Sequence, residues 1–123
     1  MIGIGIIGFG NVGQGIYNIF REKGSFISER LGTHIEIRKI LVRSKEKYQD
    51  LVDDSSLLTT DVNDILTDSA IQIVIEVIGG EYPAFDFISN ALNSKKHVVT
   101  ANKEVVSKHK QHFFKTAKEN GVD

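Results

Sequence analysis

The sequence predicts an α/β protein in which a parallel β-sheet is wound on both faces by helices. Short runs of β-branched residues alternate along the chain with longer segments that have helical spacing of apolar residues. Two runs, Ile2–Ile7 and Ile71–Ile78, are apolar at almost every position, which is typical of strands buried on both faces. Strands that alternate with helices in this way favour a doubly wound sheet with right-handed crossovers.

The first third of the chain predicts a strand, a helix and a second strand. The apolar residues after strand Ile2–Ile7 recur with helical spacing and are expected to form one buried helical face. They are Val12, Ile16, Ile19 and Phe20. Gly24 can end this helix, with Ser25–Leu31 as an irregular helical extension. The next strand is expected over Ile35–Val42, followed by a polar loop, Lys45–Ser56, that can hold a helical turn near Tyr48–Leu51.

The middle of the chain predicts a short strand at Leu57–Thr59 and a brief helix over Val62–Leu66. Asp61 can cap that helix, because a carboxylate accepts hydrogen bonds from the first free N–H groups. Strand Ile71–Ile78 ends at the pair Gly79-Gly80. If the strands follow the usual order of a doubly wound sheet, this strand lies beside Ile2–Ile7.

The last third predicts a helix, a strand and a final helix. Pro83 suits the first turn of a helix that buries Phe85, Ile88 and Leu92. His97–Thr100 is expected to be a short strand, and Asn102 to cap the last helix before Gly121 ends it. The residues expected to face inward on that helix are Val106, Phe113, Phe114 and Ala117.

Length and composition describe one folded domain over residues 1–123, with no linker or repeat. A net charge of −1 gives no reason to expect a nucleic acid or a membrane surface as partner. The chain has no cysteine and its four histidines form no ligand pattern, so we expect no metal site and a cytoplasmic location. His109 and His112 are expected on the solvated surface of the last helix. Val122-Asp123 stand where another strand would begin, which predicts a sheet truncated before a catalytic domain.

A glycine-rich turn, Gly8-Phe9-Gly10-Asn11-Val12-Gly13, follows the first strand and opens the first helix. The G-x-G-x-x-G spacing in this context is typical of a Rossmann-type dinucleotide-binding domain. Gly8 permits the tight turn, Gly10 lets a pyrophosphate approach the backbone, and Gly13 lets helix and strand pack closely. The helix N-terminus would then hold the phosphates. The alternative is a strand–helix turn without a ligand.

The residues after the second strand indicate which dinucleotide is bound. NAD-binding domains usually place a carboxylate here for the ribose 2′-hydroxyl, whereas this chain has Arg43, with Lys45 and Lys47 nearby. A guanidinium at this place can bind a 2′-phosphate, which favours NADP, with NAD possible. The alternative is that Arg43 is solvated or pairs with Glu46 or Asp50.

Two later turns are expected at the same edge of the sheet, where parallel strands end. Ile78, Gly79 and Gly80 would line the ribose and nicotinamide, unless they form a plain turn. The buried carboxylate of Glu76 is expected to accept hydrogen bonds from that turn, because an unpaired charge would be costly.

The turn Thr100–Glu104 carries the candidate catalytic residue, Lys103. Its cation could bind an anionic substrate group, polarise a carbonyl or donate a proton. The alternative is a surface lysine at a helix start.

Three motifs together resemble the N-terminal domain of homoserine dehydrogenases. They are I-G-I-I-G-F-G-N-V-G-Q-G-I at 4–16, E-V-I-G-G at 76–80 and H-V-V-T-A-N-K-E at 97–104. The resemblance implies hydride transfer between NAD(P)(H) and homoserine or aspartate semialdehyde, in threonine and methionine biosynthesis, by a homo-oligomer. It also implies that Phe9, Asn11 and Val12 adjoin the pyrophosphate, and that Thr100 and Lys103 lie by the nicotinamide.

The resemblance further implies that substrate-binding residues and a second functional lysine lie in a following domain. We therefore expect the 123-residue chain to bind nucleotide without turning over homoserine. Two alternatives stay open. Another NAD(P)-dependent dehydrogenase would keep the glycine turn but should lack T-A-N-K. A non-catalytic nucleotide-sensing module would need only the adenosine half of the site, so Lys103 and Gly79-Gly80 argue against it.

Overall fold

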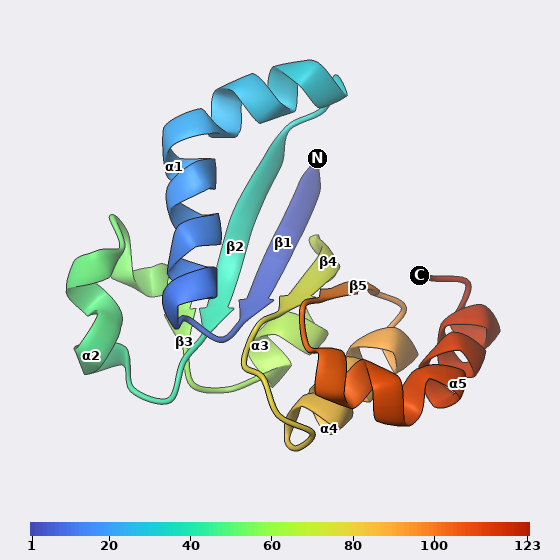
Figure 1. Cartoon of the computed structure of the whole chain (residues 1–123). Coiled ribbons are helices and arrows are strands. Elements are labelled where there is room, and N and C mark those ends of the chain that lie inside the picture. Colours follow the sequence, from blue (N-terminus) through green and yellow to red (C-terminus); the bar gives the residue numbers. More distant parts are fainter.

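The computed structural model describes all residues, 1–123, as a five-stranded parallel sheet covered by helices (Figure 1). The strands are β1 (Ile2–Ile7), β2 (Ile35–Leu41), β3 (Leu58–Thr59), β4 (Ile71–Glu76) and β5 (His97–Thr100). Their order across the sheet is β3-β2-β1-β4-β5, and every neighbouring pair is parallel. The order changes direction between β1 and β4, which confirms the predicted α/β class and the predicted neighbours.

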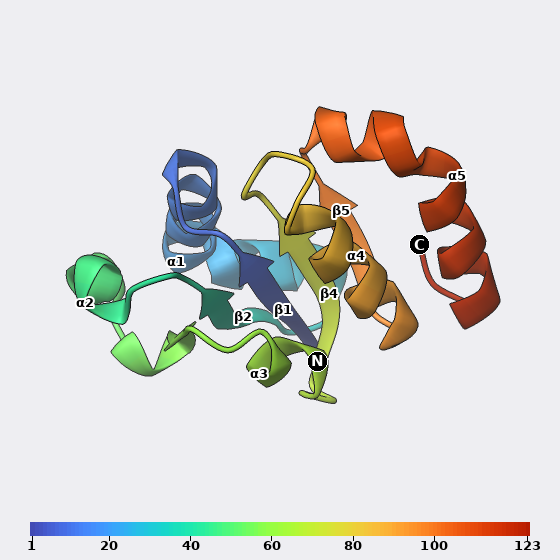
Figure 2. The ribbon, with the colours of Figure 1, turned by 90° about the horizontal axis from the view of Figure 1, so that it is seen from below.

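Helices connect the strands on both faces of the sheet. They are α1 (Asn11–Leu31), α2 (Lys45–Tyr48), α3 (Asn63–Leu66), α4 (Ala84–Asn93) and α5 (Lys103–Asn120), with 3-10 turns at Gln49–Leu51 and Ser55–Leu57. Seen from below, α1 lies on one side of the sheet and α3 on the other (Figure 2). The segment after β2 holds the helical turn predicted near Tyr48–Leu51, but more of the predicted loop is helical than expected, because α2 precedes that turn and a second 3-10 turn follows it.

The core is built on the alternation of side chains along β1. Ile4 and Ile6 join one buried cluster with Tyr17 of α1, whereas Ile7 joins another with Ile65 of α3. Gly5 makes room for the second contact, since an added Cβ would lie 2.7 Å from a methyl carbon of Ile65. A third cluster joins α4 to α5, so the last helix is held mainly by its neighbour rather than by the sheet.

Helix α1 runs longer than predicted. Gly24 does not end it, and Ser25–Leu31 continue it as α-helix up to Gly32, which adopts a left-handed φ of 72°. The hydroxyl of Ser28 explains the continuation, because it accepts a hydrogen bond from the N–H of Ile35 at 3.0 Å and ties the last turns to β2. This contact helps to offset a helical glycine, which costs about 1 kcal/mol relative to alanine.

Two predicted buried faces are partly wrong. Val12 and Ile19 are 56% and 53% exposed, because α1 turns Gly13 and Tyr17 toward the sheet instead. On α5, Phe113 is buried but Phe114 is exposed. The buried face of α5 is formed by Val105, Phe113 and Thr116, and a non-helical residue interrupts the helix at position 109.

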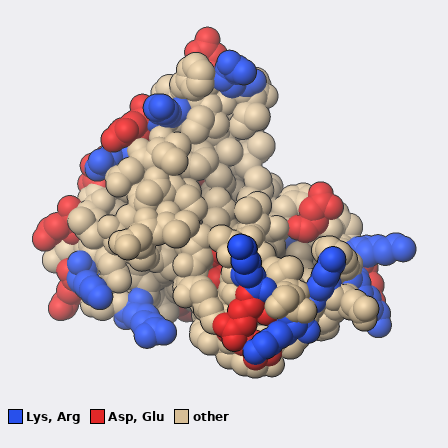
Figure 3. All heavy atoms as spheres, in the orientation of Figure 1, with Lys and Arg blue, Asp and Glu red and all other residues tan.

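The surface beside α1 has little charge at its centre. In Figure 3 the charged side chains gather along the outer side of α1 and over α5, with an uncharged area between them. Val99 of β5 is among the exposed apolar residues of the chain.

The last residues return to the edge of β5, where the N–H of Val98 donates to the carbonyl of Asp123 at 3.1 Å. None of the helices is long and apolar enough to cross a membrane.

Candidate dinucleotide-binding site

The glycine turn adopts the geometry that its spacing predicts. Gly8 has a φ of 106°, a left-handed conformation that residues with a Cβ rarely adopt. An added Cβ on Gly13 would lie 2.4 Å from the carbonyl oxygen of Gly8, so helix and turn pack backbone to backbone. Gly10 differs from both, because a Cβ built there meets nothing within 4 Å. The space above Gly10 is therefore open to a ligand.

The first turn of α1 presents free hydrogen-bond donors beside this open space. The N–H groups of Asn11, Val12 and Gly13 have no acceptor within the chain, and Gly10 has no side chain to cap them. The helix dipole adds partial positive charge at the same end. Free donors, positive potential and an open glycine together fit a pyrophosphate group.

Phe9 lies between these glycines, but its side chain does not face the open space. Its ring is buried and packs edge-on against Tyr17 and Tyr48, with centroids 5.8 and 5.7 Å apart. The ring thereby holds the turn against α1 and the segment after β2. Only the exposed edge of this residue is available to a ligand.

A cleft of about 470 Å³ lies beyond the ends of β1, β2 and β4. The structure brings Gly8, Phe9, Gly10, Arg43 and Ile78 together around it. Further lining residues that sequence reasoning did not assign to the site are Leu41, Val42, Ser44, Lys47, Tyr48, Thr60, Val77, Pro83 and Phe87. Apolar walls with a few polar groups are typical of ligand clefts.

Two cations stand at the β2 side of the cleft. Arg43 is exposed and forms no ion pair, so the alternative pairings with Glu46 and Asp50 are not made. Lys47, four residues later, lies on α2, with its Nζ 5.3 Å from the centroid of the Tyr48 ring. The sequence shows that Arg43 and Lys47 are four residues apart. It does not predict α2, the helix that places Lys47 on the same side of the cleft as Arg43.

The turn after β4 is shaped by the buried carboxylate of Glu76. One of its oxygens accepts the N–H groups of Ile78 and Gly79 at 2.9 and 3.3 Å, which confirms the predicted role of Glu76. The contact draws the chain out of the extended conformation, so β4 ends two residues before the predicted limit at Ile78. Gly79 and Gly80 then adopt left-handed φ values of 77° and 75°.

The turn after β5 meets the turn after β4. The side chain of Asn102 accepts the N–H of Val105 at 3.2 Å, which confirms the predicted cap, and its amide group donates to the carbonyl of Gly80. Thr100 is half-buried behind this contact. Lys103 is the first residue of α5, exposed and without an ion pair. Both predicted turns therefore lie at the edge that holds the glycine turn.

A second contact ties the β4 turn to α5. Glu81 pairs with His109 at 2.6 Å and with Lys108 at 3.2 Å. The hydrogen bond from His109 and, after it, that from Lys108 hold the pKa of Glu81 below its usual value. Sequence reasoning treats His109 as a solvated residue, which is wrong, because its ring is only 22% exposed and also stacks near Phe85.

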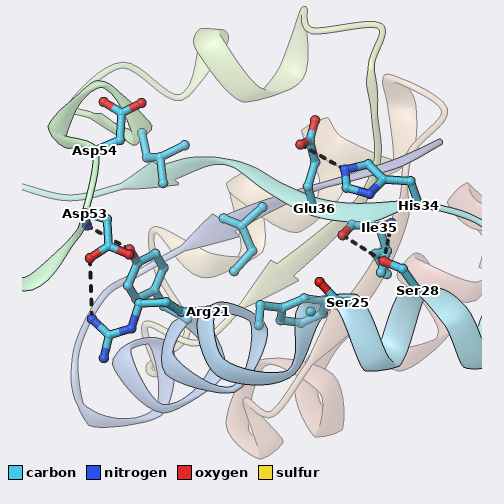
Figure 4. Close-up of a pocket in the computed structure, with 13 residues that line it drawn as sticks. Arg21, Ser25, Ser28, His34, Ile35, Glu36, Asp53 and Asp54 are labelled. Atoms are coloured by element: carbon cyan, nitrogen blue, oxygen red, sulfur yellow. Dashed lines mark hydrogen bonds and ion pairs between the residues drawn. The ribbon is translucent and has the colours of Figure 1, made fainter.

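A larger hollow, about 600 Å³, lies at the opposite end of β2 (Figure 4). Arg21 of α1 and Asp53 pair across one rim at 3.7 Å, and His34 and Glu36 pair at the other at 3.2 Å. Ligands of doubly wound sheets bind beyond the carboxyl ends of the strands, whereas this hollow lies beside the first residues of β2. We therefore assign the dinucleotide to the smaller cleft.

The sheet order, the open glycine and the free donors of α1 together define a Rossmann-type dinucleotide-binding domain. Residues 8–123 match the family described as "Homoserine dehydrogenase, NAD binding domain". The chain belongs to this family, as its three motifs predict.

Individual relatives agree with the family assignment. The chain is 38% identical over 122 residues to a homoserine dehydrogenase of Bacillus subtilis, covering 99% of this chain and 28% of that protein. The homoserine dehydrogenase of Corynebacterium glutamicum is 37% identical over 123 residues, covering 99% and 27%. A solved homoserine dehydrogenase from Thiobacillus denitrificans superposes with a TM-score of 0.90 at 37% identity, covering 98% of this chain and 28% of that one. The chain thus spans little more than a quarter of the length of these relatives.

Proposed function

We propose that residues 1–123 are the nicotinamide-binding domain of a homoserine dehydrogenase, which interconverts homoserine and aspartate semialdehyde. The observation that carries the proposal is the meeting of three turns at one edge of the sheet. The glycine turn alone would serve the adenosine half of a dinucleotide. The turns that contain Gly79-Gly80 and Lys103 extend the crevice toward a reactive end, which a nucleotide sensor does not need.

Different residues of the site bind different parts of the dinucleotide. The N–H groups of Asn11, Val12 and Gly13 bind the pyrophosphate, with Gly8 and Gly10 leaving room for it. Ile78, Gly79, Gly80 and Thr100 border the ribose and nicotinamide. The bound dinucleotide supplies the hydride acceptor or donor. Lys103 is the catalytic contribution of this domain, since its exposed cation can polarise the substrate's carbonyl or stabilise its developing alkoxide.

We propose NADP as the preferred dinucleotide, with NAD as the weaker one. Arg43 and Lys47 place two positive charges beside the cleft where a 2′-phosphate would lie, and neither is neutralised by a carboxylate. An archaeal homoserine dehydrogenase of the same fold was solved in complex with NADPH, at 23% identity and a TM-score of 0.76.

Substituting Arg43→Ala is expected to weaken NADPH binding about tenfold, because a charge-assisted contact to phosphate is lost. NADH has no 2′-phosphate, so its affinity should change less than about twofold. Titrations of the reduced dinucleotides by fluorescence measure both constants. Arg30→Ala, at the far end of α1, is the matched control for loss of an arginine. An unchanged ratio of NADPH to NADH affinity in Arg43→Ala would show that Arg43 does not select the cofactor.

The isolated chain is expected to bind NADPH without oxidising homoserine. It spans about 28% of the length of its relatives, its cleft is lined by no Asp or Glu that could bind a substrate amine, and Lys103 stands outside the cleft at the start of α5. Absorbance of reduced nicotinamide at saturating homoserine and NADP measures turnover, with a full-length homoserine dehydrogenase as positive control. Homoserine-dependent reduction of NADP by the 123-residue chain would contradict the expectation that this domain alone is inactive.

Two further proposals concern the full-length protein. We propose that it acts as a homo-oligomer on a small-molecule substrate, which the family resemblance supports. We also propose a cytoplasmic location, which is supported by a chain of 123 residues without a cysteine.

A further inference from the structure

The carboxylate of Glu76 is the most buried charged group of the domain, with no exposed surface. It stands at the end of β4, between Ile7 of β1 and Thr100 of β5. Three donors satisfy it: the N–H groups of Ile78 and Gly79 and the hydroxyl of Thr100. Burying such a group is costly unless it is fully hydrogen-bonded, so the surrounding turns must keep one arrangement.

Thr100 links the buried carboxylate of Glu76 to the turn after β5 by hydrogen bonds. Its hydroxyl donates to Glu76 and accepts the N–H of Asn102 at 3.0 Å. A hydroxyl has one hydrogen, so Thr100 has no donor left for a ligand. The resemblance places Thr100 beside the nicotinamide, but in this arrangement its polar group serves the scaffold.

Asn102 joins the turn after β4 to the start of α5. Its side-chain oxygen caps α5 through Val105, and its amide nitrogen donates to the carbonyl of Gly80. Glu76, Thr100 and Asn102 thus form one unbroken chain of hydrogen bonds from the end of β4 to the start of α5. We call these three residues the inter-turn relay.

The inter-turn relay leaves specific groups of the crevice unused. The carbonyl oxygens of Ile78 and Gly79 accept no hydrogen bond within the chain, whereas the N–H groups of both residues are occupied. The turn therefore offers acceptors and no donors at these positions. A primary carboxamide, which is the polar substituent of nicotinamide, has an NH₂ group that such acceptors can bind.

We propose that Glu76, Thr100 and Asn102 are positioning residues that hold the two turns at the spacing required by the nicotinamide carboxamide. The inference rests on the proposed dinucleotide function. The three side chains act through the turns rather than by touching the ligand. Pre-organised turns bind with less loss of conformational freedom, so breaking the relay weakens the nicotinamide half of binding only.

The test compares a ligand with the nicotinamide half to one without it. Thr100→Val removes both hydrogen bonds of the hydroxyl at nearly constant volume. We expect it to weaken NADPH binding about tenfold and to diminish the fluorescence change of bound reduced nicotinamide. The affinity for 2′,5′-ADP, which lacks nicotinamide, should stay within about twofold of the original. Thr100→Ser keeps the hydroxyl and should restore NADPH binding.

Thr116→Val is the matched control, since Thr116 is a buried threonine whose hydroxyl donates within α5. It should leave both affinities unchanged. Asn102→Asp is a second variant, because aspartate preserves the helix cap but cannot donate to Gly80. It should show the same split between NADPH and 2′,5′-ADP, even if Thr100→Val does not fold.

The outcomes separate the inference from the proposed function. If a folded Thr100→Val or Asn102→Asp binds NADPH with the affinity and fluorescence of the original chain, the inter-turn relay does not position the nicotinamide. Equal losses for NADPH and 2′,5′-ADP also overturn the inference, because they indicate a general structural role. If the unmodified chain binds neither ligand, the proposed function itself is wrong, and the inference fails with it.

Discussion

Substituting Gly10→Ala is expected to abolish most dinucleotide binding while leaving the fold almost intact. The new methyl group would meet no atom of the chain within 4 Å, so it occupies the space that the pyrophosphate needs. Moving the phosphates away weakens at least two charge-assisted hydrogen bonds from the first turn of α1. We expect a loss of about 100-fold in NADPH affinity, or ~2.7 kcal/mol.

Stability should respond much less to this substitution. Gly10 is the N-cap residue of α1 with an extended backbone that alanine can adopt, so replacement costs no more than about 1 kcal/mol. Gly15→Ala is the matched control, since Gly15 is also open within 4 Å but lies one turn into the helix. Chemical denaturation and NADPH titration measure the two effects. Near-original NADPH affinity in Gly10→Ala would place the phosphates elsewhere.

Gly13→Ala is expected to lower the free energy of unfolding strongly, whereas Gly10→Ala is expected to affect mainly NADPH affinity. Its methyl group would lie 2.4 Å from the carbonyl oxygen of Gly8, which is backbone and cannot rotate away. Overpacking of this kind costs about 1–3 kcal/mol, against a gain in helix propensity of at most about 1 kcal/mol. NADPH binding should fall too, because α1 must shift away from the turn.

The midpoint of urea unfolding measures the stability loss in Gly13→Ala. Gly15→Ala, two residues along the same helix, should instead leave stability unchanged or raise it by up to about 1 kcal/mol. The pair separates close packing from the general effect of replacing a helical glycine. Equal midpoints for Gly13→Ala and the original chain would mean that helix and turn can separate freely.

Much of the fold was predictable because its signals are local. The run Ile71–Ile78 and the turn Gly8–Gly13 each carry their structure in consecutive residues. Errors arose where distant contacts decide: α1 continues past Gly24, where Ser28 bonds to β2, and α4 covers Phe113 of α5 while Phe114 stays exposed.

The candidate site divides in the same way. The glycine turn, Arg43 and Lys103 were predictable from residue type and position after a strand. The contribution of Lys47 to the same cleft was not, because it depends on a four-residue helix with no strong signal. The pairing of Glu81 with His109 joins residues 28 positions apart, which no local pattern records.

The amino-acid sequence by itself determined the class of the domain, the glycine turn that we propose as the phosphate site, and the family. These follow from backbone requirements: a tight turn, a close approach and a strand–helix junction all require glycine at set positions. Only the tertiary structure decided how the β4 and β5 turns are joined, through the inter-turn relay. The reason is physical, because a buried carboxylate takes its hydrogen-bond donors from whichever strands the topology places beside it.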